Sequence, residues 1–287
     1  MNNLTELFCS IDDFCQNFKP QWNKKLLGSS RGPICSLSIS EILTILILFH
    51  QSNFRTFKHF YYYLNNNFSK EFPKLLSYSR FVRIQEKVFV PLFAYLLNRK
   101  GKITGISFID ATSIAVCKNK RISRNKVFKG LAKRGKTTSG WFYGFKLHLI
   151  VNDLGEILSF LLTPGNVSDL VPVEELSKGI FGKLYGDKGY ISNPLFKKLH
   201  KKGLQLFTTL RSNMKNKFMP LIDKILLRKR SIIETINDQL KNISQIEHTR
   251  HRSIANFFVN LLAGLSAYSH QKKKPSIKFA KNFAIAC

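Results

Sequence analysis

The spacing of hydrophobic residues separates a helical first region from a mixed remainder of the chain. In residues 1–102, apolar side chains recur at helical spacing, and Ser38 with Glu41 forms the signature of a capping box ahead of one such run. Further helices are predicted over residues 54–64 and 77–97. We therefore expect an all-α N-terminal region.

Basic residues lie near the starts of several of these helices. This arrangement suits a helix-turn-helix-like unit that binds DNA, and it suits equally a plain helical bundle whose aromatic residues form the core. Of the two, we adopt for residues 1–102 the expectation of a helical N-terminal region that binds DNA.

After residue 102 the pattern changes to short apolar or alternating runs, which predict strands. Three strands in a meander are followed by two strands that alternate with helices, so residues 103–265 are expected to form an α/β domain with a mixed five-stranded sheet flanked by helices. Residues 266–287 are expected to form a basic C-terminal tail, which either binds along DNA or is exposed to solvent. The predicted strands are 104–116, 141–151, 156–163, 184–185 and 204–210.

The charge balance of the chain indicates what kind of partner it binds. The chain of 287 residues carries 46 Lys and Arg against 17 Asp and Glu, a formal net charge of +29. Such an excess repels itself in a compact protein, and a nucleic acid partner neutralises it. Five scattered cysteines without metal-site spacing argue against a zinc finger and a disulfide framework. The apolar runs are too short to span a bilayer, so we expect a cytoplasmic protein without membrane contact.

A run of cations lies at residues 118–136, where no acidic residue occurs. Such a run is either a solvated face or a surface for phosphates. A metal site formed by acidic residues close to the run would favour phosphate contact, so Lys133, Arg134 and Lys136 become candidate DNA-binding residues. The nine cations are Lys118, Lys120, Arg121, Arg124, Lys126, Lys129, Lys133, Arg134 and Lys136.

Two carboxylates interrupt or end predicted strands. Asp110 lies inside the run 104–116, where an unpaired charge would cost several kcal/mol, so it either meets a metal ion or ends the strand in a turn. Asp187 follows the strand 184–185, with Gly189 permitting a tight turn. Asp169 is interpreted as a helix cap, and His148 as a structural hydrogen-bonding residue.

A third acid, Glu234, belongs to a helix predicted over residues 223–246. The face of that helix that carries Glu234 also carries Arg230, Asp238 and Lys241. Glu234 therefore either forms an exposed ion pair with Arg230 or belongs to a site. If Asp110, Asp187 and Glu234 converge, their oxygens suit two Mg²⁺ ions for phosphoryl transfer. The packing side is predicted to hold Ile232, Ile233, Ile236, Leu240 and Ile243.

These motifs together resemble bacterial insertion-sequence transposases of the DDE type, most closely insertion-sequence family 982. Asp110-Ala111-Thr112 resembles the first motif, and Gly186-Asp187-Lys188-Gly189-Tyr190 the second. Arg230, Glu234 and Lys241 match an Arg-x3-Glu-x6-Lys signature. Many relatives have Tyr three residues before the Arg; this chain has Leu227, so a role of that Tyr in positioning DNA does not carry over.

The resemblance implies a ribonuclease-H-like catalytic domain in which Asp110, Asp187 and Glu234 hold Mg²⁺, or Mn²⁺ in its place. It implies cutting at the element's terminal inverted repeats and joining of the 3′-hydroxyl to target DNA, with Arg230 and Lys241 on backbone phosphates. It also implies a homodimer on double-stranded DNA, associated with the bacterial nucleoid.

Two other functions fit the same residues. A metal-dependent DNA nuclease would cut without joining strands, and a DNA-binding repressor would carry a decayed site. The intact set of acids and cations argues against the repressor.

Overall fold

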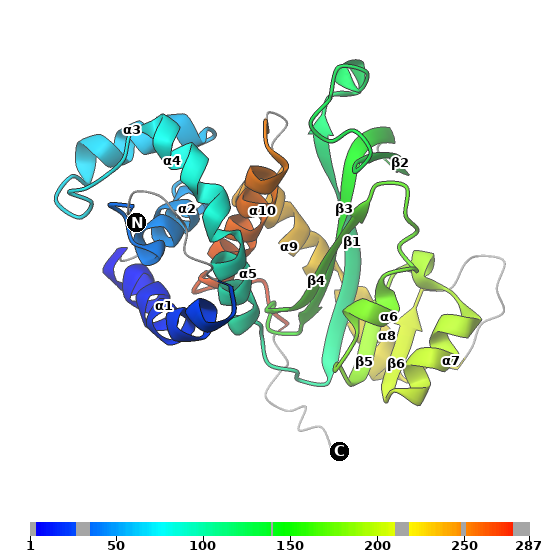
Figure 1. Ribbon diagram of the computed structural model, residues 1–287. Coiled ribbons are helices and arrows are strands. Elements are labelled where there is room, and N and C mark those ends of the chain that lie inside the picture. Colours follow the sequence, from blue (N-terminus) through cyan, green and yellow to red (C-terminus); the bar gives the residue numbers. More distant parts are fainter. Residues whose placement is uncertain (1–3, 27–34, 139, 210–217, 248–250, 278–287) are drawn as a thin grey trace. The chain divides into compact units, whose positions relative to one another are not determined.

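The computed structural model describes residues 4–26, 35–138, 140–209, 218–247 and 251–277, with only the backbone course for residues 19–26 (Figure 1). Contacts divide the chain into two compact units, Met1–Arg99 with Leu240–Gln271, and Lys100–Gln239 with Lys272–Cys287. Residues 240–265 were expected in the catalytic domain, whereas their contacts group them with the N-terminal helices. Residues 278–287 of the expected tail lie outside the described residues.

The helical unit confirms the expected all-α character of the N-terminal region. Ser38 accepts a hydrogen bond from the Glu41 N–H at 3.1 Å, and Glu41 accepts one from the Ser38 N–H at 2.6 Å, so the predicted capping box is present. The helix expected over 77–97 is divided by a 3-10 turn at Gln85–Val88. The helices are α1 (Leu4–Leu26), α2 (Ile39–Gln51), α3 (Phe57–Asn67), α4 (Tyr78–Ile84), α5 (Phe89–Asn98) and α10 (Ile254–Ser269).

Burial explains why residues near the C-terminus belong to this unit. Helix α10 is apolar on most sides and packs against α2 and α5. His50 of α2 is buried, and burial lowers its pKa to about 4, so the ring is neutral at pH 7. Its Nδ1 lies against the Ser244 carbonyl and can donate to it. This contact joins the segment after α9 to α2.

The second unit is built on a six-stranded mixed sheet in the order β2-β3-β1-β5-β6, with β4 paired to β3 (Figure 1). The mixed sheet flanked by helices is confirmed, but the expected number of five strands was wrong. The additional strand β2 lies inside the basic run, where its cations and Gly135 hid it. The strands are β1 (Ile106–Cys117), β2 (Lys133–Thr137), β3 (Gly140–Asn152), β4 (Ile157–Pro164), β5 (Gly182–Gly186) and β6 (Leu204–Thr208).

One face of the sheet packs against α6 (Val173–Leu176) and α7 (Asn193–Lys201). Alternate residues of the strands point into this core, as the alternation of a pleated strand requires. The buried cluster comprises Ile109, Ile150, Leu158, Val173, Leu176, Ile180, Leu184, Tyr190, Leu195, Leu199, Leu204 and Leu206.

The opposite face carries a stack of Phe108, Tyr185 and Phe207 from three neighbouring strands. Helix α8 (Leu221–Lys229) is attached here through the buried Asp223, which accepts hydrogen bonds from the Tyr185 hydroxyl at 2.6 Å and from Lys183 Nζ at 2.7 Å. Both faces of the parallel part of the sheet are therefore covered.

The helix expected over 223–246 is two helices, α8 and α9 (Ser231–Asn242), because Arg230 caps the first and the second begins directly after it. The expectation that Ile243 packs was wrong: it lies beyond the end of α9 and is 45% exposed. The expected cap at Ser168 or Asp169 was also wrong, since α6 begins only at Val173.

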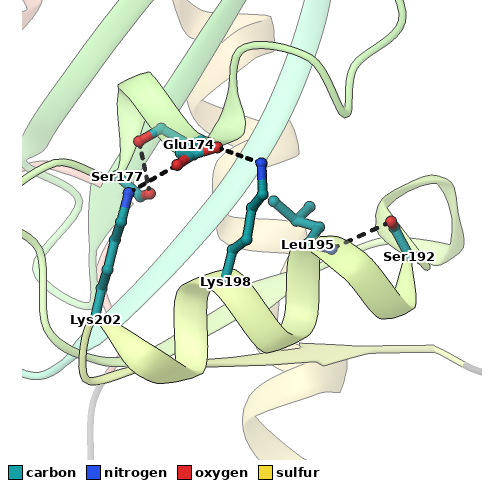
Figure 2. Close-up of polar contacts among 6 residues, drawn as sticks. All are labelled: Glu174, Ser177, Ser192, Leu195, Lys198 and Lys202. Atoms are coloured by element: carbon teal, nitrogen blue, oxygen red, sulfur yellow. Dashed lines mark hydrogen bonds and ion pairs between the residues drawn. The ribbon is translucent and has the colours of Figure 1, made fainter.

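Helices α6 and α7 are also joined at the surface (Figure 2). Glu174 accepts from Lys198 Nζ at 3.2 Å and from Lys202 Nζ at 3.0 Å. The hydrogen bonds from Lys202 and Lys198 lower the pKa of Glu174. Ser192 caps the start of α7 by accepting the Leu195 N–H. Lys198 of α7 and Lys202, at the C-terminal cap of that helix, therefore share one carboxylate.

We predict that Leu184→Ala lowers the free energy of unfolding by about 2–5 kcal/mol, because Leu184 is fully buried between the sheet and its helices. Urea unfolding followed by circular dichroism measures this change. Leu221→Ala is the control, since Leu221 is 74% exposed and its truncation should change stability by less than about 0.5 kcal/mol. Equal destabilisation of the two variants would contradict the assigned core.

Candidate active site

The parallel pairing of β1 and β5 brings Asp110 of β1 next to Asp187, the residue that directly follows β5. Ile106 pairs with Lys183 and Phe108 with Tyr185. The same register, continued by two residues, sets Asp187 opposite Asp110. Adjacent strands lie about 4.8 Å apart, so the two residues come close together where the parallel pairing of β1 with β5 ends.

Asp110 does not end its strand. Strand β1 continues to Cys117, and Asp110 remains paired with Leu149 of β3. It interrupts the hydrophobic pattern without interrupting the hydrogen-bond ladder. The alternative of a strand end with a turn is therefore wrong.

The surroundings of Asp110 disfavour its charged form. Burial is the largest cause that raises its pKa to about 6, and repulsion from Asp187 and Glu234 adds to it, while the Ala111 N–H and Arg230 act in the opposite direction. Mutual repulsion shows that the three acids lie in one region.

Asn237 of α9 fixes the Asp110 side chain, because its Nδ2 donates to Asp110 Oδ2 at 2.9 Å. Asn237 was not predicted from the sequence, although it follows Glu234 by three residues and so shares its face of the helix. A helical amide near an acid is too common a pattern to single out without the contact.

Asp187 is held by the turn that follows β5. Its carboxylate accepts the Gly189 N–H at 2.8 Å and caps the short 3-10 helix Lys188–Tyr190. A side chain at Gly189 would crowd this carboxylate, with a Cβ 2.9 Å from Asp187 Oδ1. The glycine therefore permits the close turn that directs Asp187.

Glu234 of α9 forms an ion pair with Arg230 at 2.5 Å, as the four-residue spacing predicted. Its side chain is 53% exposed, whereas that of Arg230 is 19% exposed. Glu234 can therefore change rotamer at little cost. Arg230 also lowers the pKa of Asp110, so its guanidinium lies close enough to act on more than one of the acids.

Tyr190, the last residue of the second motif, is a further polar group in this region, to which the sequence assigned no role. Its hydroxyl is buried and has no hydrogen-bond partner among the described residues. Burial, and then Asp110, Asp169 and Asp187, raise its pKa, so the hydroxyl keeps its proton. An orphaned hydroxyl among carboxylates marks a place for a polar ligand.

Asp169 pairs with Lys146 of β3 at 2.9 Å, which is its observed role in place of the expected cap. His148 lies nearby on β3, and its Nε2 is 2.8 Å from the Thr163 hydroxyl. Burial is the largest cause that lowers its pKa to about 4. His148 is thus a neutral, hydrogen-bonded residue, as interpreted from the sequence.

The donor set fits a hard divalent cation, since the acids supply oxygen ligands and carry charge that Arg230 offsets only in part. In the described part of the chain, however, no three His, Cys, Asp or Glu side chains are arranged so that they could hold a metal ion as they stand. The third carboxylate, that of Glu234, is paired with Arg230.

The candidate DNA-binding residues fall in three places, of which Arg230, beside Glu234, has been described. Lys133, Arg134 and Lys136 are exposed on β2. Lys241 lies in the helical unit, where its Nζ is 3.5 Å from Glu247. Among the described residues, no helix has both the length and the apolar composition of a membrane span.

A mixed sheet flanked by helices defines the class of this protein as α/β. Within that class, the chain belongs to the transposase DDE domain family, whose model matches residues 100–254, more than half of the sequence. It is also similar to the piggyBac transposase in a synaptic complex with hairpin DNA, solved by cryo-electron microscopy. That similarity has 11% identity and a TM-score of 0.47, and it covers 94% of this chain and 74% of the other. No curated protein matches the chain.

We predict that Asp110→Asn stabilises the protein at pH 7 relative to the parent, by about 1–3 kcal/mol. A carboxyl whose folded pKa is raised from 3.8 to about 6 contributes stability below pH 4 that is lost as the pH rises through 6. The asparagine keeps the acceptor for Asn237 and carries no charge, so the difference should shrink between pH 6 and pH 4. Urea unfolding of both proteins across this range measures it.

Glu71→Gln serves as the control for this titration, because Glu71 is exposed. Its stability should follow that of the parent protein at every pH. A gap between Asp110→Asn and the parent that does not depend on pH would contradict the raised pKa of Asp110.

Proposed function

We propose that this DDE transposase belongs to insertion-sequence family 982 of bacteria and has a ribonuclease-H-like catalytic domain. It cuts at the ends of its element and joins the 3′-hydroxyl to target DNA. The observation that carries the proposal is the register of β1 and β5, which brings Asp110 and Asp187 together, with Glu234 close enough to raise the pKa of Asp110.

In this proposal Asp110, Asp187 and Glu234 hold Mg²⁺, with Mn²⁺ able to substitute, once Glu234 turns from Arg230. The ions, when bound, stabilise the charge that develops in an in-line phosphoryl displacement. Asn237 orients Asp110, and the Gly189 N–H orients Asp187. Arg230, released from Glu234, is placed to contact a backbone phosphate.

The proposed partner is double-stranded DNA, both the terminal inverted repeats and the target. The net charge of +29 supports a polyanionic partner. Two ends must be held at once, so we propose a homodimer on DNA, with residues 1–102 and Lys241 adding further contacts. A DNA substrate places the protein with the bacterial nucleoid in the cytoplasm.

We predict that Asp110→Asn, Asp187→Asn and Glu234→Gln each reduce Mg²⁺-dependent cleavage of DNA carrying the element end by at least about 100-fold, because each removes a charged ligand. Gel assays with labelled DNA measure cleavage and joining, and filter binding shows that DNA affinity is kept. Asp238→Asn is the matched control, since this acid is exposed on the same helix.

Cleavage retained by Asp187→Asn would remove that residue from the site. Cleavage by the parent protein without any joined product, in reactions supplied with target DNA, would identify a nuclease in place of a transposase. Binding without cleavage by the parent in Mg²⁺ and in Mn²⁺ would identify a repressor.

We predict that replacing Lys133, Arg134 and Lys136 together by Ala weakens duplex binding and reduces the slope of log affinity against log salt by about 0.9 for each phosphate that is no longer neutralised. Fluorescence anisotropy over a range of salt concentrations measures the slope. Lys198 and Lys202, replaced together, are the control, because both already pair with Glu174 (Figure 2). An equal change per cation removed in the two variants would show that only total charge matters.

A further inference from the structure

One large aromatic side chain is exposed to solvent beside the basic run of residues 118–136. Trp141 begins the β3 strand and is 61% exposed, although tryptophan is among the side chains that gain most from burial. Its backbone is well held, since its carbonyl accepts Asn119 Nδ2 at 2.8 Å and its residue pairs with Lys136 of β2. The exposed ring therefore sits on a rigid part of the sheet.

The ring adjoins an open hollow in the surface. The hollow has a volume of about 420 Å³ and is lined by Asn119, Ile122, Arg134, Trp141 and Phe142. This size lies within the roughly 300–1,000 Å³ of small-ligand sites. The lining combines two aromatic rings and an aliphatic side chain with one guanidinium and one amide, which suits a flat aromatic ligand that also has polar edges.

The charge around the hollow identifies the kind of ligand. Lys136 Nζ lies over the Trp141 ring, 5.8 Å from its centroid, and Arg134 reaches the same hollow. All nine cations of residues 118–136 are exposed, and none forms an ion pair with a described carboxylate. A flat aromatic group linked to negative charge is a nucleotide. A second copy of this chain would bring its own excess of cations and be repelled.

The geometry of stacking requires that the bound base is not stacked inside a duplex. In a duplex both faces of a base are covered by its neighbours, so a side-chain ring can stack only on a base that is unpaired, turned out or at a strand end. Proteins that bind single strands combine such rings with a basic groove along the backbone.

We propose that Trp141 and the adjacent hollow form a binding site for an unpaired DNA base, with Arg134 and Lys136 on the neighbouring phosphates. The inference rests on the proposed function in that DNA is the substrate. It adds a base-binding site on β2 and β3, made of residues other than the three acids.

The test uses the full chain carrying Trp22→Phe, so that Trp141 is the sole tryptophan. Oligo(dT) should quench its fluorescence, and an abasic oligonucleotide of equal length, which has the phosphates without the bases, should not. In anisotropy titrations Trp141→Ala should weaken oligo(dT) binding by about 5- to 150-fold. Duplex binding should change less than about twofold, which also shows that the variant is folded.

Two variants bracket this result. Trp141→Phe should retain most of the oligo(dT) affinity, because a smaller ring still stacks. Phe181→Ala removes another exposed aromatic residue of the same unit and should have no effect.

Absence of quenching, equal quenching by the abasic strand, or equal weakening of oligo(dT) and duplex binding would overturn the proposal. So would a shift of Trp141→Ala from dimer to monomer with unchanged DNA binding, which would make the ring a contact between copies. Mg²⁺-dependent cleavage measured on the same preparations separates the two ideas: cleavage without stacking refutes this inference alone, and stacking without cleavage refutes the proposed function alone.

Discussion

The parallel pairing of β1 with β5 is the constraint on which the candidate site depends. Residues 77 positions apart become neighbours because Phe108 pairs with Tyr185, and the same register sets the acids two positions further on opposite each other. The hydrophobic layers on both faces hold this register, since a slip by one residue would move Leu184 out of the core and Tyr185 out of its aromatic stack. The register that buries the core residues is therefore the same register that positions the two acids.

Acids that lie close together on a hydrophobic sheet repel one another and are stabilised by nearby positive charge. Burial and mutual repulsion raise the pKa of Asp110 to about 6, and an amide, a backbone N–H and an arginine each engage one acid. These partners orient the acids and offset only part of their charge. The negative charge that remains fits a divalent cation with oxygen ligands.

The basic run illustrates how local composition can hide structure. Its glycines and lysines are poor indicators of a strand, yet Lys133–Thr137 pairs with the start of β3. A glycine is required at position 135, because a Cβ there would lie 2.2 Å from the Gly165 carbonyl oxygen. The same pairing places Lys136 beside Trp141, so a segment in which no strand was expected presents cations beside an aromatic ring on the sheet.

The sequence alone determined the helical character of the first region, the Ser38 capping box, the meander of three strands and the pairing of Glu234 with Arg230, because each depends on periodicity or spacing over a short stretch of chain. Tertiary structure decided the rest. The Asp169–Lys146 pair, the contact of Asn237 with Asp110 and the grouping of α10 with the N-terminal helices all arise from contacts between residues distant in the chain. No local pattern encodes which of many plausible partners such a side chain meets, since that choice is made by the packing of whole elements.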